Sequence, residues 1–171
     1  MRAGGLAVPM GGEWKIIGVD DVYHGKVQTS QPRSRGRVPK PTKTGRSGPT
    51  DKRPVISLAE RGGAVRSFHV AAADKATVAK IVRENAAEES LLQTDESRRY
   101  VPVGVEFAAH ETVRHEAEEY ARGDATINSV AGFCGISMRS MVGIYQHCAD
   151  KLLHQYMAEY DFRYSGRMKL G

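Results

Sequence analysis

The chain has 171 residues, of which 40% are hydrophobic and 26% charged, and its formal net charge is +5. This length is enough for one domain with a buried core, and the composition is that of a globular protein rather than a disordered or fibrous one. No apolar run approaches the ~20 residues of a membrane-spanning helix, which excludes a protein that crosses the membrane by helices.

The N-terminus and the cysteines indicate a cytoplasmic protein. Residues 1–10 contain no apolar stretch long enough for the core of a signal peptide, so we do not expect export. The two cysteines, Cys134 and Cys148, have no Cys-x-x-Cys partner, so the sequence suggests neither a zinc ribbon nor a disulfide framework. We therefore expect two free, reduced thiols.

A basic segment, residues 26–53, differs in composition from the rest of the chain. Nine basic residues and one acid, Asp51, give it a net charge of +8, so the remainder carries −3. Its prolines and glycines cannot sustain a helix or a central strand. We predict a mobile loop that attracts DNA phosphates by counterion release, although a solvated insertion without a partner fits equally well. The residues assigned to DNA binding are Arg33, Arg35, Arg37, Lys40, Lys43, Arg46, Lys52 and Arg53.

Three strands are predicted in the first part of the chain, after an irregular, Gly-rich lead-in at residues 1–13. Residues 14–19, 54–60 and 65–70 are rich in β-branched and other apolar side chains, and Arg61-Gly62-Gly63 between the last two is a hairpin signal. We expect an antiparallel, three-stranded meander. The first strand ends at Asp20 and Asp21.

A helix and a fourth strand follow. Asp74 can cap a helix over residues 75–85, whose apolar face contains Val78, Ile81 and Val82. The apolar pair Leu91-Leu92 then leads to Asp95 at a strand end. If this helix crosses over to a strand beside the first one, Asp95 lies near Asp20, as a paired-carboxylate metal site requires.

Two more helices are predicted near the C-terminus. One begins near Thr126, with Asp124 as its cap. The other begins at Asp150 and has a set of residues at helical spacing that should pack on the sheet: Leu152, Leu153, Tyr156, Met157 and Tyr160.

Short motifs occur in a fixed order along the chain. They include Asp20-Asp21-Val22-Tyr23, Thr94-Asp95-Glu96-Ser97, Gly143-Ile144-Tyr145-Gln146-His147-Cys148 and Ala158-Glu159-Tyr160-Asp161-Phe162-Arg163-Tyr164. From about Gly11 to the C-terminus, the chain resembles the catalytic domain of bacterial insertion-sequence DDE transposases of the ISXO-like group. The resemblance implies a ribonuclease H-like α/β fold over residues 14–165, with a tail at 166–171. Its mixed sheet would combine the antiparallel meander with parallel strands, flanked by helices.

The resemblance also implies a function, which is metal-dependent DNA strand cleavage and strand transfer in DNA transposition. The expected partners are transposon-end and target DNA, with homo-oligomer formation left open, and no membrane or small-molecule substrate is expected. Asp20 and Asp95 match the first two catalytic carboxylates, and Asp21 is expected to be a solvated neighbour rather than a ligand. Two Mg²⁺ or Mn²⁺ ions about 4 Å apart would activate the nucleophile and stabilise the leaving oxygen.

The chain departs from the family pattern at two positions on the helix that begins near Thr126. The family's glutamate, the third carboxylate, corresponds to Ala131, and its lysine corresponds to Met138. A methyl group cannot bind a metal ion, so we expect a weakened site. Asn128, about one turn before Ala131, could supply a carbonyl oxygen, although the spacing to Gly143 fits position 131 rather than 128.

Three hypotheses for function remain open. The first is an N-terminally short transposase with impaired or absent activity, because the family's upstream DNA-binding part has no counterpart in this sequence. The second is a non-catalytic DNA-binding remnant that uses the basic segment. The third is a gene fragment without a function, and the sequence does not separate it from the second.

Overall fold

The computed structural model describes residues 8–24, 52–113, 128–143 and 148–167. Its strands are β1 (Ile16–His24), β2 (Arg53–Glu60), β3 (Val65–His69), β4 (Leu91–Asp95) and β5 (Ala109–Val113). Its helices are α1 (Lys75–Asn85), α2 (Val101–Gly104), α3 (Asn128–Gly143) and α4 (Asp150–Gly166). None of the described helices is long and apolar enough to cross a membrane.

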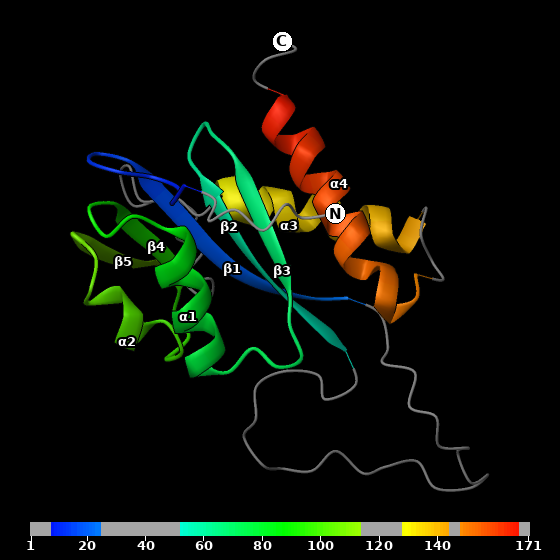
Figure 1. Ribbon diagram of the computed structural model, residues 1–171, viewed down its shortest axis with the longest axis horizontal. Coiled ribbons are helices and arrows are strands. Elements are labelled where there is room, and N and C mark those ends of the chain that lie inside the picture. Colours follow the sequence, from blue (N-terminus) through cyan, green and yellow to red (C-terminus); the bar gives the residue numbers. More distant parts are fainter. Residues whose placement is uncertain (1–7, 25–51, 114–127, 144–147, 168–171) are drawn as a thin grey trace, which may run out of the picture.

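The five strands form one mixed sheet in the order β3-β2-β1-β4-β5 (Figure 1). β1 pairs with β2, and β2 with β3, in antiparallel fashion. β4 pairs in parallel with both β1 and β5. The predicted meander and the crossover to a strand beside β1 are therefore confirmed. This sheet with its flanking helices is the ribonuclease H-like fold.

Helix α1 has the predicted bounds, and the reason for its start is visible. The carboxylate of Asp74 accepts a hydrogen bond of 2.8 Å from the backbone N–H of Thr77, as an N-cap residue does. The expected apolar face is buried, with Val78 and Val82 fully inaccessible and Ile81 nearly so. In α4, Leu153, Met157 and Tyr160 are buried as expected, but the expectation for Leu152 is wrong, because its side chain is 41% exposed.

The predicted bounds of the first strand are wrong. Trp14 has a φ of 66° and lies outside β1, which begins at Ile16 and continues to His24. The strand is longer because β2 pairs with it as far as His24, opposite Arg53. Asp20 and Asp21 are therefore inside the strand rather than after it, and consecutive strand residues point to opposite faces of a sheet.

Two short elements, α2 and β5, were not predicted. α2 has only four residues, and β5 consists largely of polar or half-exposed residues, so neither shows the periodicity that identifies an element. β5 forms because it pairs with β4 along its whole length, which is a long-range contact.

Each face of the sheet carries its own hydrophobic core, and α1 and α3 lie on opposite faces (Figure 1). On the α1 face, Ile17, Val19 and Leu92 pack with residues of α1 and with Tyr100. On the α3 face, residues of β1 and β2 pack with a set from α3 and α4 that includes Val130, Phe133, Cys134, Leu153 and Met157. The two faces therefore give β1 two different environments.

Helix α4 also covers the edge strand β3. The N–H of Ser67 donates a 2.7 Å hydrogen bond to Asp161 Oδ2, and the N–H of Val65 donates a 3.0 Å bond to the hydroxyl of Ser165. The hydroxyl of Ser67 donates a further bond to Asp161 Oδ1, at 2.7 Å. Edge strands otherwise present such N–H groups to other chains, so α4 closes this edge of the sheet.

Candidate active site

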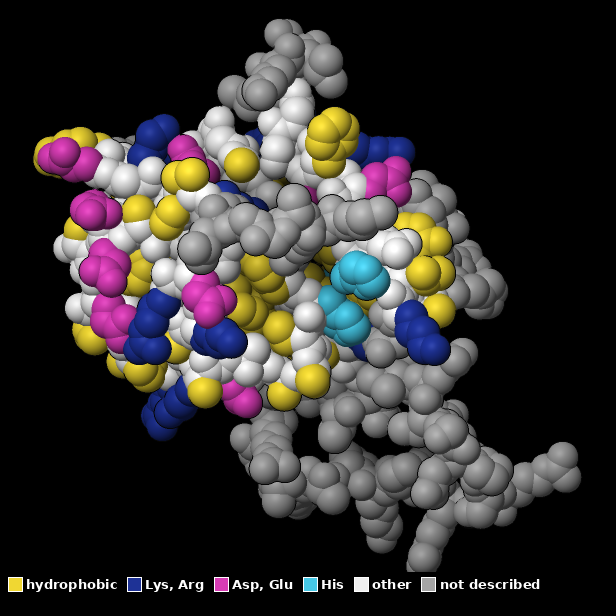
Figure 2. Space-filling view, in the orientation of Figure 1, with side chains coloured by type: hydrophobic (Ala, Val, Ile, Leu, Met, Phe, Trp, Pro, Cys, Tyr) yellow, Lys and Arg dark blue, Asp and Glu magenta, His cyan; other side chains and the backbone are white. Residues whose placement is uncertain are grey.

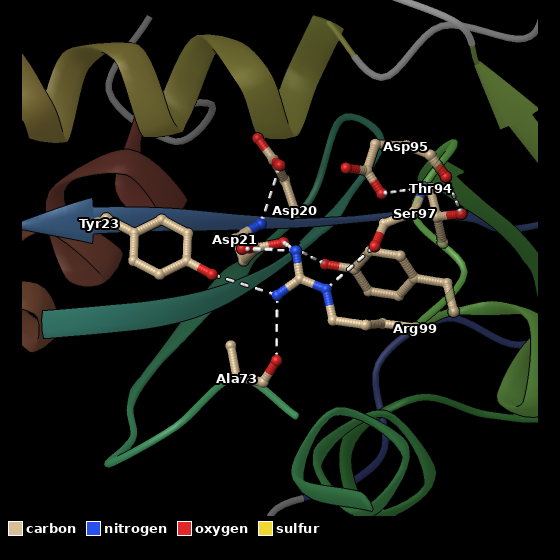
Figure 3. A network of polar contacts seen from close by, with 9 residues as sticks. Asp20, Asp21, Tyr23, Ala73, Thr94, Asp95, Ser97 and Arg99 are labelled. Atoms are coloured by element: carbon tan, nitrogen blue, oxygen red, sulfur yellow. Dashed lines mark hydrogen bonds and ion pairs between the residues drawn. The ribbon is translucent and has the colours of Figure 1, made fainter. Parts of the chain in front are cut away.

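Asp20 and Asp95 lie on neighbouring parallel strands. The register pairs Val19 with Thr94, so each aspartate is the next residue along its own strand. Alternation along β1 puts Asp20 on the face of Gly18 and Val22, which α3 covers. Figure 3 shows both carboxylates on this side of the sheet. The register thus gives the two aspartates neighbouring positions on adjacent parallel strands.

Main-chain donors hold one oxygen of each carboxylate. The N–H of Asp21 donates to Asp20 Oδ1 at 2.8 Å, and the N–H of Ser97 donates to Asp95 Oδ1 at 3.0 Å. A carboxylate offers about four acceptor positions, and each of these N–H groups occupies one of them.

Helix α3 lies directly against β1 at this point. A Cβ atom on Gly18 would be 2.9 Å from Val130 Cγ1, so the glycine permits the close approach. One turn further along α3, the Cys134 thiol forms side-chain hydrogen bonds with Ser57 and Asp20. Burial raises the pKa of this thiol, and the negative charge of Asp20 raises it further, so the sulfur stays protonated. No pattern in the sequence predicts this contact.

The other positions of interest on α3 lie near that contact. Ala131 is half-buried and precedes Cys134 by three residues, and Met138 is half-buried and packs against the core of the α3 face. Asn128 is the first residue of α3, but its side chain is outside the described part of the structure, as is Asp124. Within the described residues, no three or more His, Cys, Asp or Glu side chains are grouped to hold a metal ion.

The donor set fits one hard divalent cation better than two. Mg²⁺ is commonly bound through one or two carboxylates, while water and substrate phosphates fill its other positions. Asp20 and Asp95 provide this minimum. A site for two ions needs further carboxylates, and the part of the chain that the structure describes supplies no third acid at position 131.

The expectation that Asp21 is solvated is wrong. Its side chain is only 4% exposed and points to the α1 face, opposite Asp20 (Figure 3). Nη2 of Arg99 donates to both carboxylate oxygens of Asp21, at 3.0 and 3.1 Å, and the Tyr100 hydroxyl donates to Oδ1 at 3.1 Å. Burial raises the pKa of Tyr100, and the charges of Asp21, Asp95 and Asp20 raise it further, so this hydroxyl remains a donor.

Arg99 has further partners around Asp21. Its Nη1 donates to the Tyr23 hydroxyl at 3.2 Å and to the carbonyl of Ala73 at 3.0 Å, and its Nε donates to the Ser97 hydroxyl at 3.0 Å. The signal in the sequence was the alternation along β1. A strand that continues past Asp21 puts this residue on the buried face of Val19, where a carboxylate requires a partner.

Most of the basic segment lies outside the described residues, including Arg33, Arg35, Arg37, Lys40, Lys43 and Arg46. Lys52 is exposed just before β2. Arg53 is in β2 rather than in a loop, and its side chain is buried. Its guanidinium donates to the carbonyls of His24, at 3.3 Å, and Cys148, at 2.9 Å. Arg53 thus joins β2 to the end of β1 and to the residues before α4.

A separate groove of about 880 Å³ lies between α1, β3 and α4. Its lining includes His69, His154, Lys80 and Glu84, and none of its lining residues belongs to β1, β4 or α3. Figure 2 shows histidine side chains together on this face of the molecule. The groove is therefore distinct from the paired aspartates.

Comparison with protein families agrees with the motifs. The model of one family, described as the ISXO2-like transposase domain, matches residues 11–165. Among solved structures, the chain is similar to one titled "Crystal structure of the Mos1 Strand Transfer Complex", with a TM-score of 0.38 and 11% sequence identity. That alignment covers 91% of this chain and 54% of the other, so this chain spans about half of its length. No curated protein matches. Because the family match covers most of its length, this chain belongs to the ISXO2-like DDE transposase domain family, whose members act in DNA transposition.

Proposed function

We propose that this chain is the catalytic domain of an insertion-sequence transposase whose metal-dependent DNA cleavage and strand transfer are impaired. The observation that carries the proposal is the position of Asp20 and Asp95 on adjacent parallel strands, beneath a helix that has Ala131 where the family has its third acid. We therefore propose that the site has two of the three carboxylates that the family pattern contains.

Asp20 and Asp95 are the residues proposed to bind Mg²⁺ or Mn²⁺. The N–H groups of Asp21 and Ser97 each donate a hydrogen bond to one oxygen of these two carboxylates and thereby orient them. When bound, the cation would supply a Lewis acid for a DNA phosphodiester. The protein's part is to hold two hard oxygen ligands on one face of the sheet.

Two features of α3 support impaired rather than full activity. The methyl group of Ala131 leaves a cation with one carboxylate fewer, and each lost carboxylate weakens Mg²⁺ binding directly. Met138 packs against the core of the α3 face and places no positive charge where the family has lysine. Loss of a carboxylate and of a phosphate-binding cation on one helix would affect both metal and DNA binding.

A second candidate function is DNA binding without catalysis. It is favoured by the missing acid at position 131 together with the +8 charge of residues 26–53. Such binding would rest on phosphate contacts, and its affinity would fall steeply with salt. It would also be unaffected by Asp20→Asn, because that side chain would have no role in it.

The experiment is a nicking and strand-transfer assay on labelled transposon-end DNA in Mg²⁺ and in Mn²⁺. The chain as given is compared with the Ala131→Glu, Met138→Lys double variant, with Asp20→Asn added to each as the control. If the double variant cuts the DNA and the unmodified chain does not, the proposal is supported. If the chain as given cuts, and Asp20→Asn or Asp95→Asn abolishes the cutting, the claim of impairment is wrong and Asn128 becomes the residue to test. If neither protein cuts but salt-sensitive DNA binding remains, the second candidate is favoured.

A further inference from the structure

Asp20 and Asp95 each pair with a strand on their outer side, Asp20 with Ser57 in β2 and Asp95 with Val113 in β5, but no pair of the β1–β4 ladder joins them directly. The parallel ladder between β1 and β4 ends at the pair of Val19 and Thr94, one residue before the two aspartates. Beyond that pair, a side-chain contact between the two strand segments can add to the pairing that each keeps with its outer neighbour. Arg99, from the segment that follows β4, lies at this position on the α1 face (Figure 3).

One guanidinium contacts both residues whose N–H groups hold the aspartates. Asp21 donates its N–H to Asp20, and its carboxylate accepts two hydrogen bonds from Arg99 Nη2, at 3.0 and 3.1 Å. Ser97 donates its N–H to Asp95, and its hydroxyl accepts a bond of 3.0 Å from Arg99 Nε. Arg99, Asp21 and Ser97, which we call the Arg99 bridge, therefore link the two carboxylates through the backbone.

We propose that Arg99 is a positioning residue that fixes the separation of the Asp20 and Asp95 carboxylates from the opposite face of the sheet. This inference rests on the proposed function, in which these two carboxylates bind a divalent cation. Arg99 itself does not contact that cation. It acts through Asp21 and Ser97, which lie next to Asp20 and two residues after Asp95.

The chemistry of arginine suits this role. A guanidinium is planar and holds its donors in fixed relative positions. Because Nη2 contacts Asp21 and Nε contacts Ser97, this one rigid group constrains the distance between these two residues. Asp21 is 4% exposed and Arg99 is 22% exposed, which limits alternative hydration of the pair. The carbonyl of Ala73 and the hydroxyl of Tyr23 occupy Nη1, so the guanidinium is held from three sides.

A positioning role and a purely electrostatic role predict opposite effects on metal binding. Removing a positive charge close to a cation site lowers the repulsion of the incoming ion, so metal binding would tighten. Removing the bridge would let the two carboxylates separate, so metal binding would weaken. The sign of the change therefore identifies the role, independently of any catalytic activity.

The first readout is Mn²⁺ affinity, measured by electron paramagnetic resonance of the free ion. Arg99→Met and Arg99→Lys are each introduced into the chain as given and into the Ala131→Glu variant. The control is Arg83→Met, which removes another arginine that binds a carboxylate, that of Glu106, with two donors. We expect both Arg99 variants to bind Mn²⁺ about ten-fold or more weakly, as for other residues that orient metal ligands, and the control to bind normally. Unchanged or tighter binding by the Arg99 variants overturns the proposal.

The second readout needs no metal. Hydrogen exchange of the Asp21 and Ser97 amides, followed by NMR, reports the two bonds that hold the aspartates, and the Val82 amide in α1 reports whether the fold is intact. We expect faster exchange at Ser97 in Arg99→Lys, with Val82 unchanged, and no such effect in Arg83→Met. Unchanged exchange at Ser97 overturns the proposal even if metal binding is observed. If no protein binds Mn²⁺ but Ser97 exchange accelerates, the bridge is supported and the proposed function fails.

Discussion

The guanidinium of Arg99 donates two hydrogen bonds to the carboxylate of Asp21, and this ion pair connects two segments 78 residues apart in the sequence. It lies on the α1 face of β1, while the neighbouring residue, Asp20, faces α3. Two consecutive residues of one strand thus carry a structural carboxylate and the proposed metal ligand on opposite faces of the sheet. The consequences for stability and for the site can be measured separately.

Asp21→Asn should be strongly destabilising. The substitution leaves the charge of Arg99 without its counter-ion in a mostly buried place, which costs about 2–4 kcal/mol of unfolding free energy. Urea denaturation followed by circular dichroism measures the change. The matched control is Glu106→Gln, which breaks a pair with Arg83 at the surface, where solvent screens the charges and the loss should be clearly smaller. Equal losses of unfolding free energy in the two variants would contradict the assignment of Asp21 as the buried counter-ion of Arg99.

His24 should make stability depend on pH. Burial lowers its pKa from 6.5 to about 4, and the charges of Arg53 and His69 contribute. The folded state therefore resists a proton that the unfolded chain accepts, so this contribution is fully present above pH 6.5 and is lost as the pH falls towards 4. We expect the free energy of unfolding to fall by up to ~3 kcal/mol between pH 6.5 and 4. Urea denaturation at each pH measures this change. In His24→Gln the pH dependence should be shallower by this amount, and an identical slope would exclude His24 as its source.

Asp161→Ala should weaken the attachment of α4 to the edge of the sheet. Two hydrogen bonds from Ser67 lose a charged acceptor, which costs about 2–3 kcal/mol. The control, Ser165→Ala, removes one neutral acceptor from the N–H of Val65 and should cost about 1 kcal/mol. Hydrogen exchange at the Ser67 amide should accelerate only in Asp161→Ala. Retained protection there would show that α4 is not what covers β3.

Gly18→Ala tests the close approach of α3 to β1. The added methyl group would lie 2.9 Å from Val130 Cγ1, so α3 must shift, at a cost of about 1–3 kcal/mol. Adding Val130→Ala should recover part of this loss, since it removes the atom that is struck. Gly132→Ala is the control, because a methyl group there meets nothing within 4 Å and should stabilise α3 by up to ~1 kcal/mol. If the double variant loses as much unfolding free energy as the two single variants together, this contact is contradicted.

Local patterns predicted much of the framework. The β-branched runs, the Gly62 turn and the Asp74 cap act within a few residues, so the meander and α1 could be inferred without knowing their neighbours. The crossover rule then predicted that β4 lies beside β1, as the sheet shows. These features depend on local backbone propensities, which can be read from one sequence, and on the handedness of crossover connections, which is a general rule.

The remaining features depend on contacts between distant segments. β1 extends to His24 because β2 pairs with it, and that pairing decides which face Asp21 occupies. Arg99 then reaches Asp21 from the segment that follows β4, and Cys134 reaches Asp20 from α3. No local pattern marks an arginine or a cysteine for such a contact. The residues of the proposed site were thus easier to predict than the residues that hold them in place.

The central claim is that Asp20 and Asp95 form a metal site that lacks its third carboxylate at position 131. The most direct test is a titration with Mn²⁺ of the chain as given, of Ala131→Glu, and of Ala131→Glu combined with Asp20→Asn. The account predicts weak binding by the first protein, binding about ten-fold or more tighter by the second, and loss of binding in the third. Equal affinity of the first two proteins, or binding that survives Asp20→Asn, would contradict it.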